Sequence, residues 1–352
     1  MNPVERGLRG VDRFQQRHRA AAFVFGVIKK YGDDNGGTLA ASLAHSAFVS
    51  VFPLLLILVT ILGFIASGNN AIHEDVLSAV GGQFPLIGNQ LAGNVHALHR
   101  SSVIGLVIGL AGLVWGGAGL AQAGLFTMAQ VWNLPGPSRP GYVQRLGRAG
   151  LFLGVLGGSV VITTLLTALA TYGHHALVVV VLADALALAT NIGLYFTSFR
   201  VLTPKGVPSR DLVPGAMAGG AGWTALQAAG TYLVHHYLHA DSVYGVFATV
   251  LGLLAWLYIA VELTVYAAEI NVVLVRHLWP RSIIQPPLTE ADRSSMAHQA
   301  LQNQRRPEQR VTVSFSDRPR GQKADPATPR TPAQVTPPAD RPAAEATPEQ
   351  DR

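Results

Sequence analysis

The sequence has no cysteine and little charge. Zero cysteines in 352 residues exclude disulfide bonds and thiolate metal sites. Charged residues make up 13% of the chain, whereas they make up roughly 25% of an average soluble domain. Hydrophobic residues reach 49%. This composition predicts a protein of the lipid bilayer rather than a soluble one.

The motifs of common enzyme classes are also missing. The chain has no Walker loop, no Gly-x-Gly-x-x-Gly fingerprint after a strand and no Gly-x-Ser-x-Gly elbow. We therefore expect no enzymatic activity and no cofactor. Without an ATP site, transport would run on an ion gradient or downhill.

Six long apolar segments dominate the rest of the chain. A membrane-spanning helix needs about 20 predominantly apolar residues, and the segments cover residues 39–67, 103–126, 150–172, 176–199, 213–234 and 243–275. They predict an all-α integral membrane protein, a bundle of six transmembrane helices. Because the first 38 residues lack the apolar core and cleavage site of a signal peptide, the first span is expected to direct insertion.

The Lys and Arg residues indicate the orientation of these spans. They gather before the first span, in the second and fourth connections and after the last span, whereas the first connection has Arg100 alone and the third and fifth have none. Basic residues favour the cytoplasmic side, so both termini are predicted in the cytoplasm of a multi-pass inner (plasma) membrane protein. The net charge of +6 is spread over loops and tails, which argues against nucleic acid as a partner.

Three regions follow from this layout. Residues 1–38 form a cytoplasmic amphipathic segment, in which apolar residues and arginines alternate as in a basic helix on the inner membrane face or a solvated helix. Residues 39–285 form the membrane domain, with short external interfacial helices between 71 and 99. Residues 286–352 are rich in Pro, Ala, Thr, Gln and Arg and predict a disordered cytoplasmic tail.

Glycines recur at four-residue spacing in several spans, a pattern that lets helix backbones approach closely. They are Gly105, Gly109, Gly112, Gly116, Gly150, Gly154, Gly158, Gly215 and Gly219. The expected role is packing within the bundle, and the alternative is the contact of a homo-oligomer. Pro53 inside the first span predicts a kink.

Short motifs in a fixed order resemble the YihY/BrkB family of bacterial inner-membrane proteins. They are the first-span stretch 39–56 with Pro53, Trp132-Asn133, Pro214-Gly215-Ala216, Val243-Tyr244-Gly245, Trp256-Leu257-Tyr258 and Ala268-Glu269-Ile270-Asn271. The resemblance covers about residues 15–285. It implies six membrane helices and marks Pro53, Asn133, Tyr244, Gly245, Trp256, Glu269 and Asn271 as family positions.

The same family carries an old assignment as ribonuclease BN. A metal-dependent nuclease of that type needs a His-x-His-x-Asp-His ligand run, which is absent from this sequence. Ribonuclease activity is therefore not expected.

Four ionisable residues fall inside the apolar spans, where each needs a partner or a function. They are His45, Asp184, Glu262 and Glu269. At a rise of about 1.5 Å per residue, His45 and Glu269 are predicted in a layer near the cytoplasm, and Asp184 and Glu262 in the outer half. Either they are hydrogen-bonded within the bundle, or they line a cavity and carry protons or a cation.

Histidines gather in or beside the predicted external loops. They are His73, His96, His99, His174, His175, His235, His236 and His239. The pairs His96 with His99 and His235 with His239 have a spacing that can chelate a metal on one helix face. Histidine is also an ordinary interfacial residue, so these are weak metal candidates.

The sequence thus favours a transporter or translocator of a small solute, ion or lipid, coupled to protons or cations. The alternative is a membrane scaffold or envelope-integrity protein with no substrate path. The expected partners are the lipid bilayer and an unidentified solute, ion or lipid, and a second copy of the chain is the alternative reading of the glycine stripes.

Overall fold

A computed structural model describes residues 3–66, 103–139, 141–172, 177–203, 206–237 and 245–315, and these residues contain helices and no strands. The α-helices are α1 (Pro3–Arg17), α2 (Arg19–Asp33), α3 (Gly36–Ala66), α6 (Val103–Val131), α7 (Tyr142–Tyr172), α8 (Leu177–Leu202), α9 (Val213–Tyr237), α10 (Gly245–Val275) and α11 (Glu290–Gln302). Two short 3-10 helices, η1 (Gly136–Ser138) and η2 (Ser209–Leu212), lie in the connections.

The long helices α3 and α6 to α10 cover the six predicted apolar segments. Within the described residues, three stretches are long and apolar enough to cross a membrane: Gly109–Val131, Asp184–Leu202 and Val250–Val275. The all-helical prediction is confirmed, and three of the predicted spans have the required length and hydropathy.

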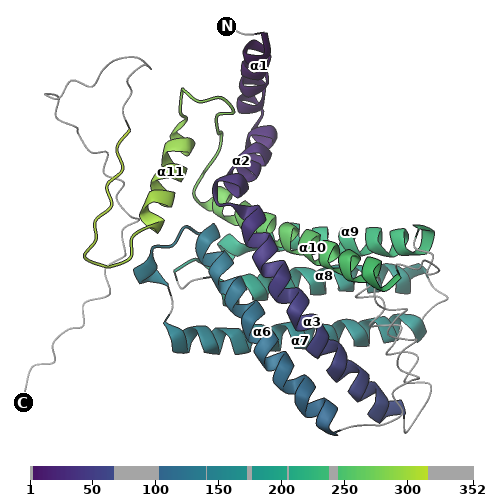
Figure 1. Ribbon diagram of the computed structural model, residues 1–352. Helices are drawn as coiled ribbons and strands as arrows, with labels where there is room; N and C mark the ends of the chain where they lie inside the picture. Colours follow the sequence, from purple (N-terminus) through teal and green to yellow (C-terminus); the bar gives the residue numbers. More distant parts are fainter. Residues whose placement is uncertain are drawn as a thin grey trace, which may run out of the picture.

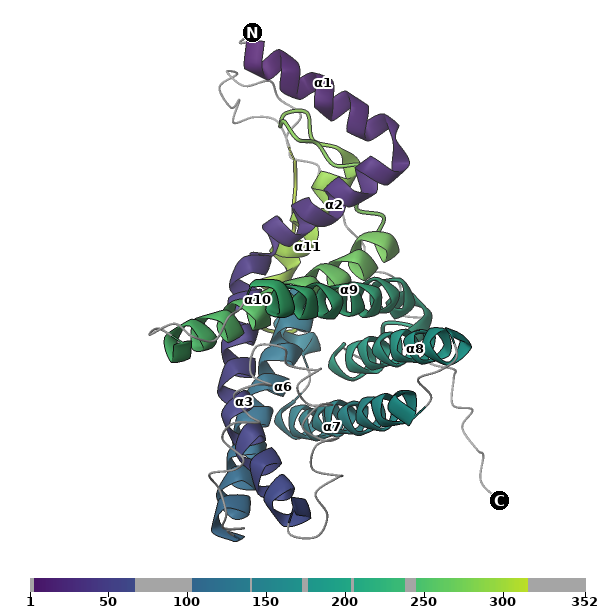
Figure 2. The ribbon, with the colours of Figure 1, turned by 90° about the vertical axis from the view of Figure 1, so that its right-hand side faces the viewer.

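Each of these helices packs mainly on the next one in the chain, and α10 also packs on α3, which closes a ring. Figure 1 shows α3 and α6 running diagonally together, whereas α7, α8, α9 and α10 lie roughly parallel to one another. The two groups converge at the end that carries α2 and α11, as Figure 2 shows from the side.

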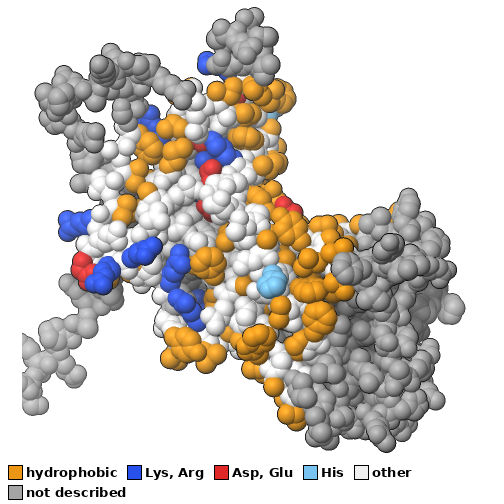
Figure 3. Space-filling view, viewed as in Figure 1, with side chains coloured by type: hydrophobic (Ala, Val, Ile, Leu, Met, Phe, Trp, Pro, Cys, Tyr) orange, Lys and Arg blue, Asp and Glu red, His pale blue; other side chains and the backbone are white. Residues whose placement is uncertain are grey.

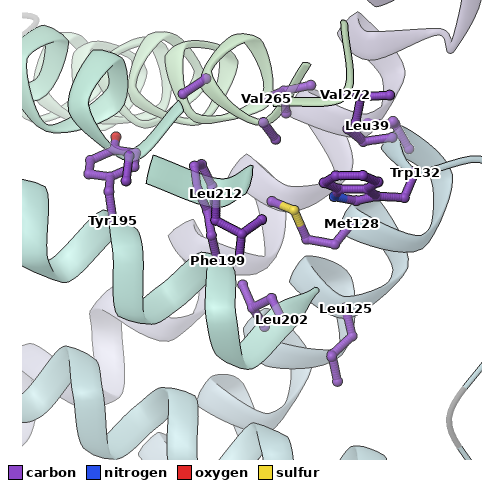
Figure 4. Packing of buried hydrophobic residues seen from close by; sticks show 14 of the residues in the cluster. Leu39, Leu125, Met128, Trp132, Tyr195, Phe199, Leu202, Leu212, Val265 and Val272 are labelled. Atoms are coloured by element: carbon purple, nitrogen blue, oxygen red, sulfur yellow. The ribbon is translucent and has the colours of Figure 1, made fainter. Parts of the chain in front are cut away.

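The main apolar core lies at this convergent end. It brings together residues from the C-terminal turns of α6, α8 and α10 with η2 and the start of α3 (Figure 4), including Met128, Trp132, Phe199, Leu212, Val272 and Leu39. Burying each such side chain contributes about 1.5–3 kcal/mol. The predicted cytoplasmic ends are therefore the firmly packed part of the described bundle.

The glycine stripes differ in what they contact. A Cβ atom at Gly215 would lie 2.1 Å from the carbonyl oxygen of Ala267, and one at Gly219 would lie 2.4 Å from the Tyr195 ring. A Cβ at Gly112 would lie 3.0 Å from Pro53. A Cβ at Gly116 would lie 3.2 Å from the Cα atom of Ser50. By contrast, Gly150, Gly154 and Gly158 have nothing within 4 Å. The packing prediction is confirmed for α9 and for Gly112 and Gly116 of α6, and is wrong for α7.

The N-terminal segment, predicted as a surface helix, has two differently placed parts. Helix α2 packs on α10 and buries Ala22, Gly26, Val27 and Lys30. Helix α1 extends away from the bundle, across the direction of α7 to α10 (Figures 1 and 2). Only α1 thus has the character expected of a surface helix.

The predicted disorder of the tail is wrong for residues 286–302. Thr289 and Asp292 form a capping box at the start of α11, and Ala291, Ser295 and Ala297 are buried against the protein. The Thr-x-x-Asp signal for a helix start was present in the sequence. Residues 316–352 lie outside the described part of the chain, as do the expected external helices between 71 and 99.

Candidate functional site

A group of buried charges lies at the convergent end of the bundle, centred on Lys30 in the last turn of α2. The Lys30 side chain is fully buried. Its Nζ forms an ion pair with Asp34, donates to the carbonyl oxygen of Val131 at 3.1 Å and lies 3.4 Å from Glu269 Oε2. Lys30 therefore connects α2 to the end of α6 and to α10.

Glu269 differs from the other residues of this group because its carboxylate has no hydrogen bond to any described residue. It is fully buried on α10, and neither carboxylate oxygen has a hydrogen-bond partner among the described residues. Its contact with Lys30 is thus an ion pair without hydrogen-bond geometry. Buried ion pairs are often no more stable than apolar residues of similar volume, so this arrangement points to a function rather than to stability alone.

Asn133 and Arg276 continue the network. Asn133 ends α6 in the left-handed region with φ 44°, where Asn is tolerated better than most residues. Its amide nitrogen donates to Asp34 Oδ1 at 3.0 Å, and its amide oxygen accepts from Arg276 at 3.3 Å. Arg276 also donates to the Trp132 carbonyl at 2.6 Å. The Trp132-Asn133 motif thus holds two charged residues in place.

The surroundings affect Arg276 directly. Burial lowers its pKa to about 10, while Asp34 and Glu269 partly oppose this shift. Its guanidinium also lies 6.0 Å from the centre of the Trp132 ring, within the range of a cation–π contact. Arg276 remains a cation near neutral pH in spite of its burial.

A second layer of charges lies beside the first and contains α11. Asp292 accepts from Lys29 at 2.8 Å, from Arg281 at 2.7 Å and from the backbone N–H of Ser282 at 3.0 Å. Burial alone would raise the pKa of Asp292, but these hydrogen bonds and the one from Thr289 outweigh it and hold the pKa well below its usual range.

The two layers are joined through the end of α2. Arg281 pairs with Asp33 at 2.6 Å, and the Gln299 amide of α11 donates to the Asp33 carbonyl at 2.8 Å and to Asp34 Oδ1 at 3.3 Å. The cations of both layers are Lys29, Lys30, Arg276 and Arg281, and the carboxylates are Asp33, Asp34, Glu269 and Asp292. Equal numbers of opposite charges make the network close to neutral overall when all are ionised. We call these eight residues the charge network.

Of the four predicted intramembrane residues, Glu269 belongs to the charge network and Glu262 lies beside it. Tyr31, the neighbour of Lys30, donates to Glu262 at 3.1 Å and stacks on Tyr266. Burial and then the Glu262 charge raise the pKa of Tyr31. Glu262 therefore has a hydrogen-bond partner on α2, outside the predicted spans, and its predicted place in the outer half of the membrane stays a prediction.

The other two residues are separate from the network. His45 on α3 and Asp184 on α8 have exposed side chains, and no hydrogen bond or ion pair links either to it within the described residues. The structure therefore does not bring His45 to Glu269 or Asp184 to Glu262. Their functional roles stay predictions.

The remaining family positions contribute to helix packing, begin a helix or lie outside the described residues. Asn271 Oδ1 accepts from the backbone N–H of Gly215 at 2.7 Å and so fixes α9 to α10. Trp256 is buried and packs on Gly230. Pro53 is partly exposed and packs on Gly112. Gly245 begins α10. Tyr244 lies outside the described part of the chain.

The metal candidates are not tested by the structure. His96, His99 and His239 lie outside the described residues, and the side chain of His235 is likewise not described. Among the side chains that are described, no group of three His, Asp or Glu residues could hold a metal ion.

Lys30, Asp34, Arg276, Arg281 and Asp292 were not predicted as site residues. From the sequence, the Lys and Arg residues indicated only the orientation of the spans. One available signal was the spacing of Lys30 and Asp34, which places an ion pair on one helix face. Burial of Lys30 was not available from sequence, since it depends on contacts with α6 and α10.

Comparison with known families gives the same assignment as the motifs. The family model described as virulence factor BrkB matches residues 27–287. The chain belongs to the BrkB family. The match includes Lys30, Asp34, Glu269 and Arg276 and ends before Asp292. No curated protein and no solved structure matches the chain. Family membership together with the apolar helices identifies a membrane protein.

Proposed function

We propose that this BrkB-family protein is a six-span inner-membrane transporter, with both termini in the cytoplasm, that moves a small solute, ion or lipid by coupling to protons or cations. The observation that carries the proposal is the fully buried Lys30–Glu269 ion pair, 3.4 Å apart, where the helices converge. Burying an ionisable pair costs free energy, so such pairs commonly serve a function.

In this proposal, the charge network acts as a closed gate at the cytoplasmic end of the bundle. It joins α2, the end of α6, the end of α10 and α11 through hydrogen bonds and ion pairs. A proton or cation at Glu269 removes the attraction between Glu269 and Lys30, while Lys30 keeps its partner Asp34. Such an event loosens α2 from α10, the type of bistable contact that a gate requires.

Ion flux tests the proposal. Purified protein is reconstituted in liposomes holding pH- or sodium-sensitive dyes, and the wild type is compared with Glu269→Gln. The matched control is Glu308→Gln, the same change at an exposed carboxylate. We expect flux above that of empty liposomes for wild type and control, and a loss of at least about tenfold for Glu269→Gln, because the neutral amide cannot carry the ion.

A second assay covers the lipid branch of the proposal. The same liposomes are tested for translocation of a fluorescent phospholipid from one leaflet to the other. Lipid movement without ion flux would select lipid as the substrate and reject ion coupling. Absence of both activities in the folded wild type would reject transport and favour the scaffold alternative.

A further inference from the structure

Helix α1 presents two kinds of exposed side chain that the charge network does not use. Leu8, Val11 and Phe14 follow one another at three-residue spacing and are 44%, 55% and 61% exposed. Arg9, Arg13 and Arg17 recur at four-residue spacing and are also exposed. These spacings place the apolar residues on one face of the helix and the arginines on another.

Contacts with the chain after α10 fix the rotation of α1. The Gln15 amide donates to the Arg281 carbonyl at 2.6 Å, and the backbone N–H of Ile283 donates to Asp12 at 2.9 Å. Because Asp12 and Gln15 face the segment after α10, Val11 and Phe14 are held away from it, whereas Arg9 and Arg13 lie along its edge. A helix that was merely solvated would need no such fixed orientation.

The position of α1 matches the membrane interface. The helix runs across the direction of α7 to α10, at the end of the bundle where α2 and α11 lie (Figures 1 and 2). Val24 and Ile28 of α2 are also exposed. In Figure 3, apolar side chains along α1 and α2 continue toward the apolar surface of the bundle, while Lys and Arg side chains gather on the opposite side.

A pocket of about 470 Å³ lies between α1 and the segment 282–289. Arg9, Asp12, Arg13 and Gln16 line it from the helix, and Ile284, Leu288 and Thr289 line it from the segment. The Asp12 carboxylate accepts from the backbone N–H of Ile283. Guanidinium groups beside apolar side chains suit a ligand with a phosphate and a hydrocarbon part.

We infer that α1 and the segment 282–289 form a binding site for anionic phospholipid of the cytoplasmic leaflet. Leu8, Val11 and Phe14 enter the region of the acyl chains, and Arg9 and Arg13 bind the headgroup phosphate. The charge of the leaflet is complementary to the arginine face. The inference rests on the cytoplasmic orientation proposed above and is independent of transport.

The absence of cysteine makes a direct test possible, since an introduced cysteine is the single thiol of the full-length chain. A fluorescent dye is attached to Val11→Cys on the apolar face, or to Gly10→Cys, which is one residue away toward the arginine face and has nothing within 4 Å. Each protein is reconstituted with phosphatidylcholine, with or without phosphatidylglycerol, and quenching by lipids with brominated acyl chains is measured.

We expect the dye at position 11 to be quenched at least about twofold more than the dye at position 10, with the difference largest in phosphatidylglycerol. Arg9→Gln with Arg13→Gln should remove the dependence on phosphatidylglycerol. The control Arg305→Gln with Arg306→Gln removes the same charge from exposed positions after α11 and should leave it unchanged.

Equal quenching at both positions, or quenching that ignores the headgroup, would overturn the inference. Disulfide formation between two Val11→Cys chains together with low quenching would assign the face to a second copy instead. Ion flux measured in the same liposomes separates the proposals. Normal flux without the quenching difference rejects the lipid site alone, whereas the quenching difference without flux rejects transport alone.

Discussion

At the scale of single residues, two glycines with the same sequence signal have opposite surroundings. A Cβ atom at Gly215 would meet the Ala267 carbonyl at 2.1 Å and the Asn271 side chain at 2.5 Å. Since backbone cannot move aside cheaply, we expect Gly215→Ala to destabilise the protein by about 1–3 kcal/mol. Thermal unfolding in detergent measures this as a lower melting temperature.

The matched control is Gly154→Ala on α7, where nothing lies within 4 Å. Alanine favours a helix over glycine by up to about 1 kcal/mol, so this variant should melt at the same or a higher temperature. An equal loss of stability in both variants would contradict the packing described for α9.

Some of the polar residues at the charge network could be predicted from the sequence, and others could not. Glu269 and Asn133 were found through family motifs, and both lie in or against the charge network. Lys30 was missed because a lysine at the end of a helix is normally solvated. Its burial arises from Val131 and Glu269, which are far away in sequence.

At the scale of elements, α11 is held to the bundle by Asp292. The folded-state pKa of this carboxyl is below its usual value, so its contribution is fully present above the unfolded pKa of about 3.9 and is lost as pH falls through the lower folded value. At pH 7, Asp292→Asn should increase amide exchange in residues 290–302 by roughly two orders of magnitude, as about 3 kcal/mol of buried ion pairing is lost.

Hydrogen–deuterium exchange with mass spectrometry measures this effect, and Glu290→Gln is the control. Glu290 lies in the same turn of α11 but is exposed, so exchange should change little. The difference between wild type and Asp292→Asn should shrink as the pH falls below about 4, since the carboxyl of the unfolded state binds a proton there while the folded carboxylate is still ionised. Equal protection at pH 7 would show that α11 does not depend on Asp292.

At the scale of the whole molecule, the positions of the N-terminal helix and of the segment after α11 predict which introduced cysteines react with a maleimide from outside the cell. Helix α1 and the segment after α11 both lie at the convergent end of the bundle (Figure 1). We expect Gly10→Cys, on the arginine side of α1, and Arg306→Cys to react with a membrane-impermeant maleimide only after permeabilisation. Gln83→Cys, in the first predicted external connection, should react in intact spheroplasts.

Reaction of Gly10→Cys in intact spheroplasts would contradict the proposed orientation. Reaction of Gly10→Cys and Arg306→Cys on opposite sides would contradict an even number of spans. Because the chain has no cysteine of its own, the unmodified protein serves as the blank in both preparations.

The sequence by itself determined the helical class, the six apolar segments and the family, because these depend on composition, local periodicity and short motifs. The tertiary structure decided which polar residues meet. Lys30 is buried against Glu269, Glu262 accepts a hydrogen bond from Tyr31, and residues 290–302 form a helix that contacts the end of α2. Such contacts join residues hundreds of positions apart, and their energies depend on burial and geometry that local patterns do not contain.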